Sequence, residues 1–134
     1  MQPKTVLVVE DDRDIRWSME QFLEEEGYAV VTASDGQAAL ERIPHLPKPS
    51  VILLDLMMPK LDGYGVLRDL ENHPEKRDSH PIFLLTANWA QLSPDMSRLL
   101  GNLGIPVLAK PFDIEQLSGQ VHSAFVRLEG KEAS

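Results

Sequence analysis

The stretch "VLVVEDD" (residues 6–12) begins as a run of apolar residues and ends in three consecutive acids. An apolar run of this length that does not alternate with polar residues is typical of a strand buried on both faces of a sheet. Glu10, Asp11 and Asp12 would then lie together at one end of that strand. Like charges this close repel one another, so water or a bound cation must offset the repulsion.

Four more apolar runs of strand length follow along the chain. They are "YAVVTA" (28–33), "SVILLD" (50–55), "PIFLLT" (81–86) and "PVLA" (106–109), and the first run extends over 5–10. The segments between them have helical spacing or helix-capping residues, which predicts helices over 12–26, 35–43, 64–72, 93–104 and 113–129. The alternation predicts an α/β fold with a doubly wound, five-stranded parallel sheet and five helices.

Within the helices, apolar spacing predicts the inward faces. In 12–26 these are Ile15, Met19, Phe22 and Leu23, and in 113–129 they are Ile114, Leu117, Val121, Phe125 and Leu128. The charged stretch 71–81 and the stretch 45–50 are expected to be loops, and residues 130–134 a frayed tail. We therefore expect a single domain over 1–134, with its core at about 4–129.

Composition excludes several classes of function. The chain has 134 residues, 43% hydrophobic and 25% charged, which is ordinary for a globular domain. It has no cysteine, which excludes disulfides and thiolate metal sites. A net charge of −8 argues against direct binding to nucleic acid. No stretch approaches the roughly 18 apolar residues that span a membrane, so we expect a cytoplasmic protein with no membrane contact.

Polar residues gather where the strands end. Ligands of doubly wound sheets bind beyond the carboxyl ends of the strands. There the sequence places Glu10, Asp11, Asp55, Thr86 and Lys110. Two carboxylates with waters and phosphate oxygens suit Mg²⁺, and a carboxylate beside Mg²⁺ can attack a phosphoryl group. Thr86 could then hydrogen-bond a phosphoryl oxygen and Lys110 could pair with its charge.

Each residue alone also has a structural interpretation. Asp12 is better explained as a helix cap than as a ligand. Asp55 could begin a loop, Thr86 fits a strand, and Lys110 fits any surface. Only their conjunction at the ends of different strands favours phosphoryl chemistry.

Five motifs, in this order, resemble the receiver domain of response regulators, the phosphoacceptor half of two-component signalling. They are "VLVVEDD", "ASDGQAAL", "VILLDLMMPKLDGYGVL", "LLTA" and "KPF", spread over about residues 4–129. The resemblance implies the flavodoxin-like strand order 2-1-3-4-5, which is the order that general accounts of this fold give for a receiver.

The resemblance also implies the role of each site residue. Asp55 would be the phosphoacceptor, with Thr86 as the switch hydroxyl and Lys110 as the phosphate-pairing lysine. Mg²⁺ would be held by Asp11, Asp55 and the backbone carbonyl of Met57, with Glu10 acting through water. The Lys110–Pro111 bond would be cis. The partners implied are a histidine kinase or phosphotransfer protein as donor, and a downstream target or fused output domain.

Some positions depart from the family pattern. Val107 stands where receivers usually carry an aromatic residue that reports phosphorylation, and Trp89 could take over part of that role. Met57 and Asn88, two residues after Asp55 and Thr86, are poor groups for orienting an attacking water, which predicts slow self-dephosphorylation. The interpretation includes self-phosphorylation and self-dephosphorylation chemistry but no enzyme activity on other substrates.

Three alternatives belong to other classes. A receiver-like interaction module that takes no phosphate is kept open by Val107. An aspartate-nucleophile phosphatase would need a second acid two residues after the nucleophile, where the sequence has Met57. A flavin-binding protein would need an uncharged phosphate loop after the first strand, where "EDD" stands. The length leaves no room for an output domain, so we expect a stand-alone receiver or part of a longer regulator, with dimerisation on phosphorylation possible.

Overall fold

The computed structural model describes residues 4–58, 60–77, 80–87, 92–110 and 113–133, with side chains up to residue 129. Its five strands form one sheet in the order β2-β1-β3-β4-β5, and every neighbouring pair is parallel. The strands are β1 (Thr5–Val9), β2 (Ala29–Ala33), β3 (Ser50–Asp55), β4 (Ile82–Thr86) and β5 (Val107–Ala109). The predicted sheet and its strand order are confirmed.

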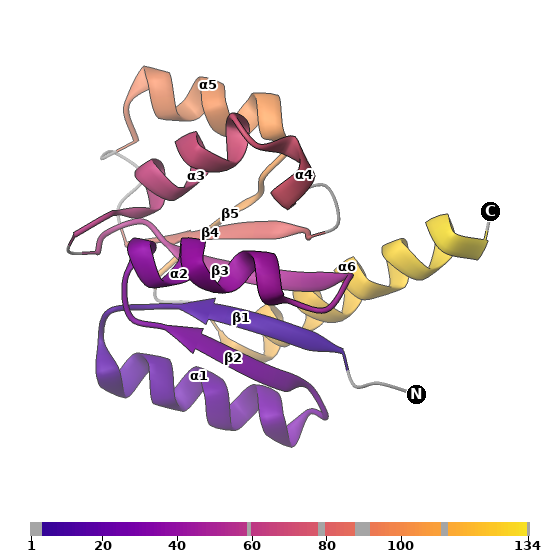
Figure 1. Ribbon diagram of the computed structural model, residues 1–134. Coiled ribbons are helices and arrows are strands. Elements are labelled where there is room, and N and C mark those ends of the chain that lie inside the picture. The colour runs from indigo at the N-terminus through magenta and orange to yellow at the C-terminus, as the bar shows by residue number, and fades with distance from the viewer. Residues whose placement is uncertain (1–3, 59, 78–79, 88–91, 111–112, 134) are drawn as a thin grey trace.

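Helices cover both faces of this sheet (Figure 1). One face carries α1 (Arg13–Glu25) and α6 (Ile114–Ala133), and the other carries α2 (Gly36–Arg42), α3 (Gly63–Glu71) and α5 (Pro94–Leu103). A short 3₁₀ turn, η1 (Ile43–His45), follows α2. Among the helices of the described residues, none is long and apolar enough to cross a membrane.

The sheet divides the core into two clusters because successive residues of a strand point to opposite faces. In β3, Ile52 and Leu54 pack toward α2, α3 and α5, whereas Val51 and Leu53 pack toward α1 and α6. All four side chains are fully buried. This two-sided burial explains why the strands are continuous apolar runs, and it leaves only the strand ends for polar residues.

Three predictions about the helices are wrong in detail. The stretch 71–81, expected to be a loop, contains the short helix α4 (Pro74–Arg77), so the described part of the chain has six α-helices where five were expected. Its residues bond back to α3: Arg77 Nε donates to the Leu70 carbonyl at 3.2 Å and Lys76 Nζ to Asp69 at 3.5 Å. The charge pattern of the stretch 71–81 alone does not predict these contacts with α3.

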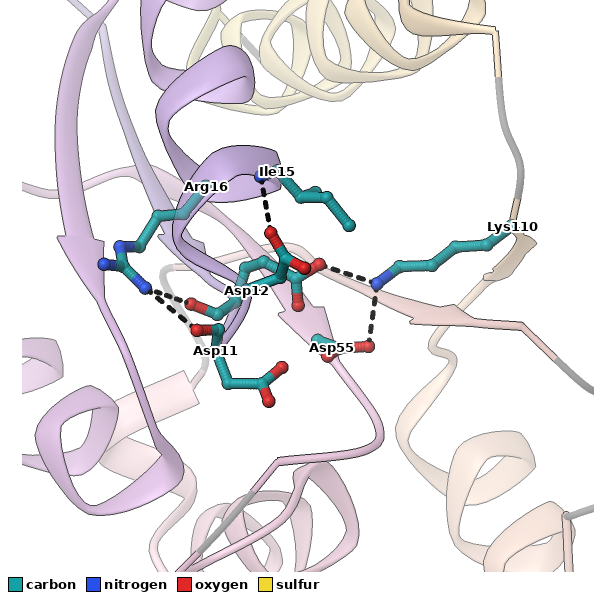
Figure 2. Close-up of polar contacts among 7 residues, drawn as sticks. Asp11, Asp12, Ile15, Arg16, Asp55 and Lys110 are labelled. Atoms are coloured by element: carbon teal, nitrogen blue, oxygen red, sulfur yellow. Dashed lines mark hydrogen bonds and ion pairs between the residues drawn. The ribbon is translucent and has the colours of Figure 1, made fainter.

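The other two differences concern α6 and α1. Helix α6 continues to Ala133, beyond residue 129 where the sequence predicted the tail, because lysine, glutamate and alanine there are good helix formers. Ile15, assigned to the inward face of α1, is 40% exposed. It lies in the first turn of the helix, beside the strand ends (Figure 2), while Met19 and Leu23 of later turns are buried.

Candidate phosphoacceptor and metal site

The sheet register brings the predicted site residues to one edge. Val9 pairs with Leu54, so Glu10 and Asp55 are the next residues of neighbouring strands. Asp55 pairs with Leu85, and Thr86 pairs with Ala109, so Lys110 follows directly beyond Thr86. The Lys110 amide also donates to the Thr86 carbonyl at 2.7 Å.

Lys110 bridges the two most buried acids (Figure 2). Its Nζ lies 2.8 Å from Glu10 Oε1 and 3.1 Å from Asp55 Oδ1. Glu10 is only 1% exposed and Asp55 only 5%. A lysine that contacts two buried carboxylates is held in place by both, so its ammonium group has a defined position at this edge.

Three carboxylates converge beside this lysine. Glu10, Asp11 and Asp55 each offer an oxygen, and these three oxygens lie within 4.8 Å of one another. Asp11 is exposed, so this group is open to solvent on the side of the β1–α1 loop. Figure 2 shows the Asp11 and Asp55 carboxyl groups on the same side of the strand ends.

Burial and charge shift the pKa values of the two central groups. Burial first, and the neighbouring Glu10 carboxyl second, raise the pKa of Asp55 from 3.8 to about 7 against the opposing effect of Lys110. For Lys110, burial lowers the pKa, but the hydrogen bond to Glu10 and the charges of Asp55 and Glu10 outweigh burial, and the net pKa is raised. The site therefore holds a charged lysine beside the Asp55 carboxyl, whose negative charge is not fully compensated.

This arrangement fits a divalent cation. Glu10 Oε2 is buried and has no hydrogen-bond partner among the described residues, which is costly unless a ligand satisfies it. Three carboxylates face a single ammonium, so positive charge is in deficit. Oxygen donors partly open to water are the set that Mg²⁺ prefers. Glu10, Asp11 and Asp55 are the residues that would hold the ion.

The two remaining predicted site residues are Thr86 and Met57. Thr86 ends β4 and is 1% exposed, next in register to the Asp55 pair. Met57 follows Asp55 by two residues, and its side chain is 57% exposed. Its carbonyl stays a predicted ligand. Val107, in β5, is partly buried against the core of the α2, α3 and α5 face.

Several other predictions lie outside the described residues. These concern Asn88, Trp89 and the Lys110–Pro111 bond, since residues 88–91 and 111–112 are not described. The proposed replacement of the aromatic reporter by Trp89 and the cis bond therefore stay predictions.

Glycine brings the β3–α3 loop close to the backbone of Asp55. The Gly63 amide donates to the Leu56 carbonyl at 2.9 Å, and Asp62 caps α3 by accepting from the Gly65 amide. A Cβ on Gly63 would lie 2.7 Å from the Asp55 carbonyl oxygen, which is closer than real Cβ atoms approach. The residue next to the acceptor backbone must therefore be glycine.

Sequence reasoning missed one residue at this site. Arg16 Nη1 donates to the Glu10 carbonyl at 2.9 Å and to the Asp11 carbonyl at 3.3 Å (Figure 2). In "EDDRDIR" Arg13 is the arginine nearer in sequence to the acids, yet Arg16 is the one that bonds to their backbone. The signal that separates them is the helix start: Asp12 caps α1 through the Ile15 amide, so Arg16 lies one turn in, where its side chain can fold back onto the loop.

Comparison with known proteins shows the family to which the chain belongs. The model of the response regulator receiver domain family matches residues 6–122. "Probable transcriptional regulator ycf27" of Cyanophora paradoxa is 41% identical over 133 residues, covering 98% of this chain and 52% of that protein. The alkaline phosphatase synthesis transcriptional regulatory protein PhoP of Bacillus subtilis is 36% identical over 126 residues, covering 94% of this chain and 50% of its own length. The chain thus spans about half the length of these curated relatives.

Solved structures show the same architecture. The receiver domain of the Francisella response regulator 1452 is 31% identical with a TM-score of 0.77, covering 95% of this chain and 99% of that one. The chemotaxis protein CheY4 of Vibrio cholerae is 28% identical with a TM-score of 0.76, covering 91% and 98%. The family model covers most of the chain and these likenesses extend over nearly all of it. The chain belongs to the response regulator receiver domain family.

Proposed function

We propose that this receiver domain accepts a phosphoryl group on Asp55 in a Mg²⁺-dependent reaction and thereby changes a protein-interaction surface. The observation that carries the proposal is the contact of Lys110 with both Asp55 and Glu10, beside the open carboxylate of Asp11. A buried nucleophilic carboxylate, a fixed ammonium and a set of oxygen ligands at one point are the parts that phosphoryl transfer to an aspartate requires.

The chemistry follows from the residues. A carboxylate oxygen of Asp55 bonds to phosphorus while the bond from phosphorus to the imidazole nitrogen of a phosphohistidine donor breaks, and the electron pair returns to the imidazole. Mg²⁺, when bound, would neutralise charge between the carboxylates and the phosphoryl oxygens. Lys110, already 3.1 Å from Asp55 Oδ1, would pair with a phosphoryl oxygen, and Thr86 would donate its hydroxyl to another.

The surface around the site suits a protein donor. Ile15 and Trp17 of α1 are large apolar side chains that are 40% and 61% exposed, and Ile15 lies in the helix turn next to the site. Trp17 also lines a groove of about 510 Å³ together with Arg16 and Thr32. We infer that a histidine kinase or phosphotransfer protein docks on α1 when it delivers the phosphoryl group.

The output is proposed from the relatives. Two of them are named transcriptional regulators and are about twice as long as this chain. A net charge of −8 disfavours direct contact of this domain with DNA. We propose that the phosphorylated domain acts on a fused or separate output protein in the cytoplasm and catalyses no reaction on other substrates.

The experiment uses a small phosphodonor, so that no partner is needed. The protein is incubated with acetyl phosphate and Mg²⁺, and intact mass reports the adduct. Asp55→Asn and a chelator should each abolish it. Asp11→Asn should nearly abolish it, whereas Asp12→Asn, a matched neutralisation one residue further, should retain it because asparagine caps a helix as well as aspartate does.

Two outcomes would overturn the proposal. An adduct that persists in Asp55→Asn would place the phosphoryl group elsewhere. No adduct in a folded sample that binds Mg²⁺ would favour a phosphate-independent interaction module.

A further inference from the structure

Arg16 is the one cation that contacts the backbone of the acidic loop among the described residues. Its Nη1 bonds to two successive carbonyl oxygens, those of Glu10 and Asp11 (Figure 2). Both carbonyls lie beyond the end of β1 at Val9, where no neighbouring strand of the described chain pairs with them. The guanidinium group therefore takes the place of a strand partner at the point where the chain turns from sheet to helix.

The contact is with carbonyls and leaves the carboxylates open. Among the described residues, Arg16 makes no ion pair with Glu10 or Asp11, and the Asp11 carboxylate accepts no hydrogen bond. An arginine bound to these carboxylates would compete with a metal ion for the same oxygens. Bound to the carbonyls, it restrains the backbone from which the two side chains project.

Lys110 holds the Glu10 carboxylate, and the other backbone restraints on this loop act at its two ends. The Glu10 amide donates to the Ala33 carbonyl at 3.1 Å, which ties the loop to β2. Asp12 caps α1 through the Ile15 amide at 3.0 Å. The Asp11 peptide between them is held by Arg16, so the direction of the exposed Asp11 carboxylate depends on this bond more than on either end.

We propose that Arg16 is a positioning residue for the cation: its guanidinium group fixes the Glu10–Asp11 backbone so that both carboxylates face Asp55. The proposal rests on the proposed function, since it concerns the same site. Groups that orient metal ligands without touching the metal typically affect metal affinity or activity about 10- to 100-fold.

Removing Arg16 should change Mg²⁺ affinity in opposite directions, depending on whether Arg16 acts through its charge or by positioning the loop. A guanidinium group beside a cation site repels the cation, so if Arg16 acted only as a charge, its removal would tighten Mg²⁺ binding. If it positions the loop, its removal weakens binding, because ligands free to turn away must be ordered again when the ion binds. The sign of the change in Mg²⁺ affinity therefore decides between the two.

The experiment is titration calorimetry of Mg²⁺ into Arg16→Met, Arg16→Lys and Arg13→Met. Arg13 is the matched control, because it is an exposed arginine at the start of the same helix that makes no hydrogen bond among the described residues. We expect Mg²⁺ affinity to fall about 10-fold in Arg16→Met. In Arg16→Lys the affinity should fall by less, because the ammonium group can still donate to a carbonyl but cannot reproduce the guanidinium geometry. Arg13→Met should bind Mg²⁺ no more weakly than wild type.

Circular dichroism and urea unfolding establish that each variant is folded, and Arg16→Lys decides the matter if Arg16→Met does not fold. Unchanged or tighter Mg²⁺ binding in a folded Arg16 variant would overturn the positioning role. The phosphorylation assay distinguishes failure of the proposed function from failure of this inference. The absence of an adduct in wild type would contradict the proposed function. An adduct in wild type, together with normal Mg²⁺ binding in both Arg16 variants, would contradict only the positioning role of Arg16.

Discussion

Asp55 is the residue at which stability and the proposed function are in conflict. Its carboxyl is buried beside Glu10, which raises its pKa to about 7, and one lysine serves both acids. A buried charge that is incompletely paired destabilises a fold, whereas a nucleophile for phosphoryl transfer must be charged. The domain therefore carries at Asp55 a free-energy cost that a bound cation would relieve.

Neutralising Asp55 should accordingly stabilise the cation-free protein. Asparagine keeps the shape of the side chain and removes its charge, so at pH 8 in chelator Asp55→Asn should raise the free energy of unfolding by about 2 kcal/mol. Each pKa unit by which burial raises the pKa of Asp55 corresponds to about 1.4 kcal/mol of destabilisation by its charge. Asparagine removes this destabilisation but also removes one charged acceptor for Lys110, which reduces the gain. Urea unfolding with and without Mg²⁺ measures this, and Mg²⁺ should narrow the gap by stabilising wild type more.

The matched control is Asp12→Asn, which removes a charge from the same loop while keeping the helix cap. It should change stability little with or without Mg²⁺. If Asp55→Asn proved less stable than wild type in chelator, the charge at position 55 would be better compensated than the structure indicates.

At the scale of elements, the loops after β1 and β3 do most to shape the site. The β1–α1 loop presents Glu10 and Asp11 and is held by Arg16. The β3–α3 loop returns to the acceptor, where the Gly63 amide bonds to the Leu56 carbonyl. Close backbone approach at Gly63 leaves no room for a side chain, so a change there should disturb both the fold and Asp55.

Replacing Gly63 with alanine tests this approach. The new Cβ would lie 2.7 Å from the Asp55 carbonyl oxygen and 2.9 Å from the Leu56 Cα, both backbone atoms that cannot turn away. We expect a loss of about 2 kcal/mol in the free energy of unfolding, measured with urea, and slower phosphorylation by acetyl phosphate.

Gly119 provides the opposite case. It lies within α6, and apart from its chain neighbours and the nearby backbone of its own helix no atom of the described residues comes within 4 Å of the position that a Cβ would occupy there. Gly119→Ala should therefore stabilise the protein by about 0.5–1 kcal/mol through helix propensity. Equal effects of the two substitutions would contradict the close contact at Gly63.

At the scale of the whole molecule, the sequence predicts what depends on strand order. The carboxyl ends of parallel strands share one edge, so "VLVVEDD" and "SVILLD" suffice to bring Glu10, Asp11 and Asp55 together, and the structure confirms that grouping. Lys110 was predicted on the same ground and contacts two of these acids.

What could not be predicted depends on contacts between side chains and distant backbone. The bond of Arg16 to the loop requires the exact start of α1, and α4 is held by bonds from its charged residues to α3. Ile15 fits the spacing of an inward face, yet only later turns of α1 lie over the sheet core. Periodicity assigns a face to a helix but does not say where the sheet beneath it ends.

The other end of the strands, where β3 and β4 begin, holds a buried titratable group that makes the stability of the fold depend on pH. His80 precedes β4, is buried, and its Nδ1 accepts a hydrogen bond from the Ser50 amide at 3.1 Å, where β3 begins. Burial is the main cause that lowers the pKa of His80, and the charge of Lys48 lowers it further. Only the neutral ring, with its proton on Nε2, can accept at Nδ1.

This predicts how the stability of the domain depends on pH. Because the pKa of His80 is lower in the folded state than in the unfolded one, the unfolded state binds more protons as pH falls below about 6.5. The contribution of neutral His80 is therefore complete near pH 7.5 and is lost as pH falls through the histidine range. Other groups titrate in the same range, so the test compares wild type with a variant that lacks only this group.

His80→Asn is that variant, because its amide oxygen can accept from the Ser50 amide and does not titrate. At pH 7.5 its free energy of unfolding should be about 1 kcal/mol lower than that of wild type, because the side chain is smaller. Urea unfolding should show this difference in the free energy of unfolding becoming smaller from pH 7.5 to pH 5.5. A gap that stayed constant or widened would mean that His80 binds its proton equally well in both states. The protonation of His80 would then leave the stability of the domain unchanged.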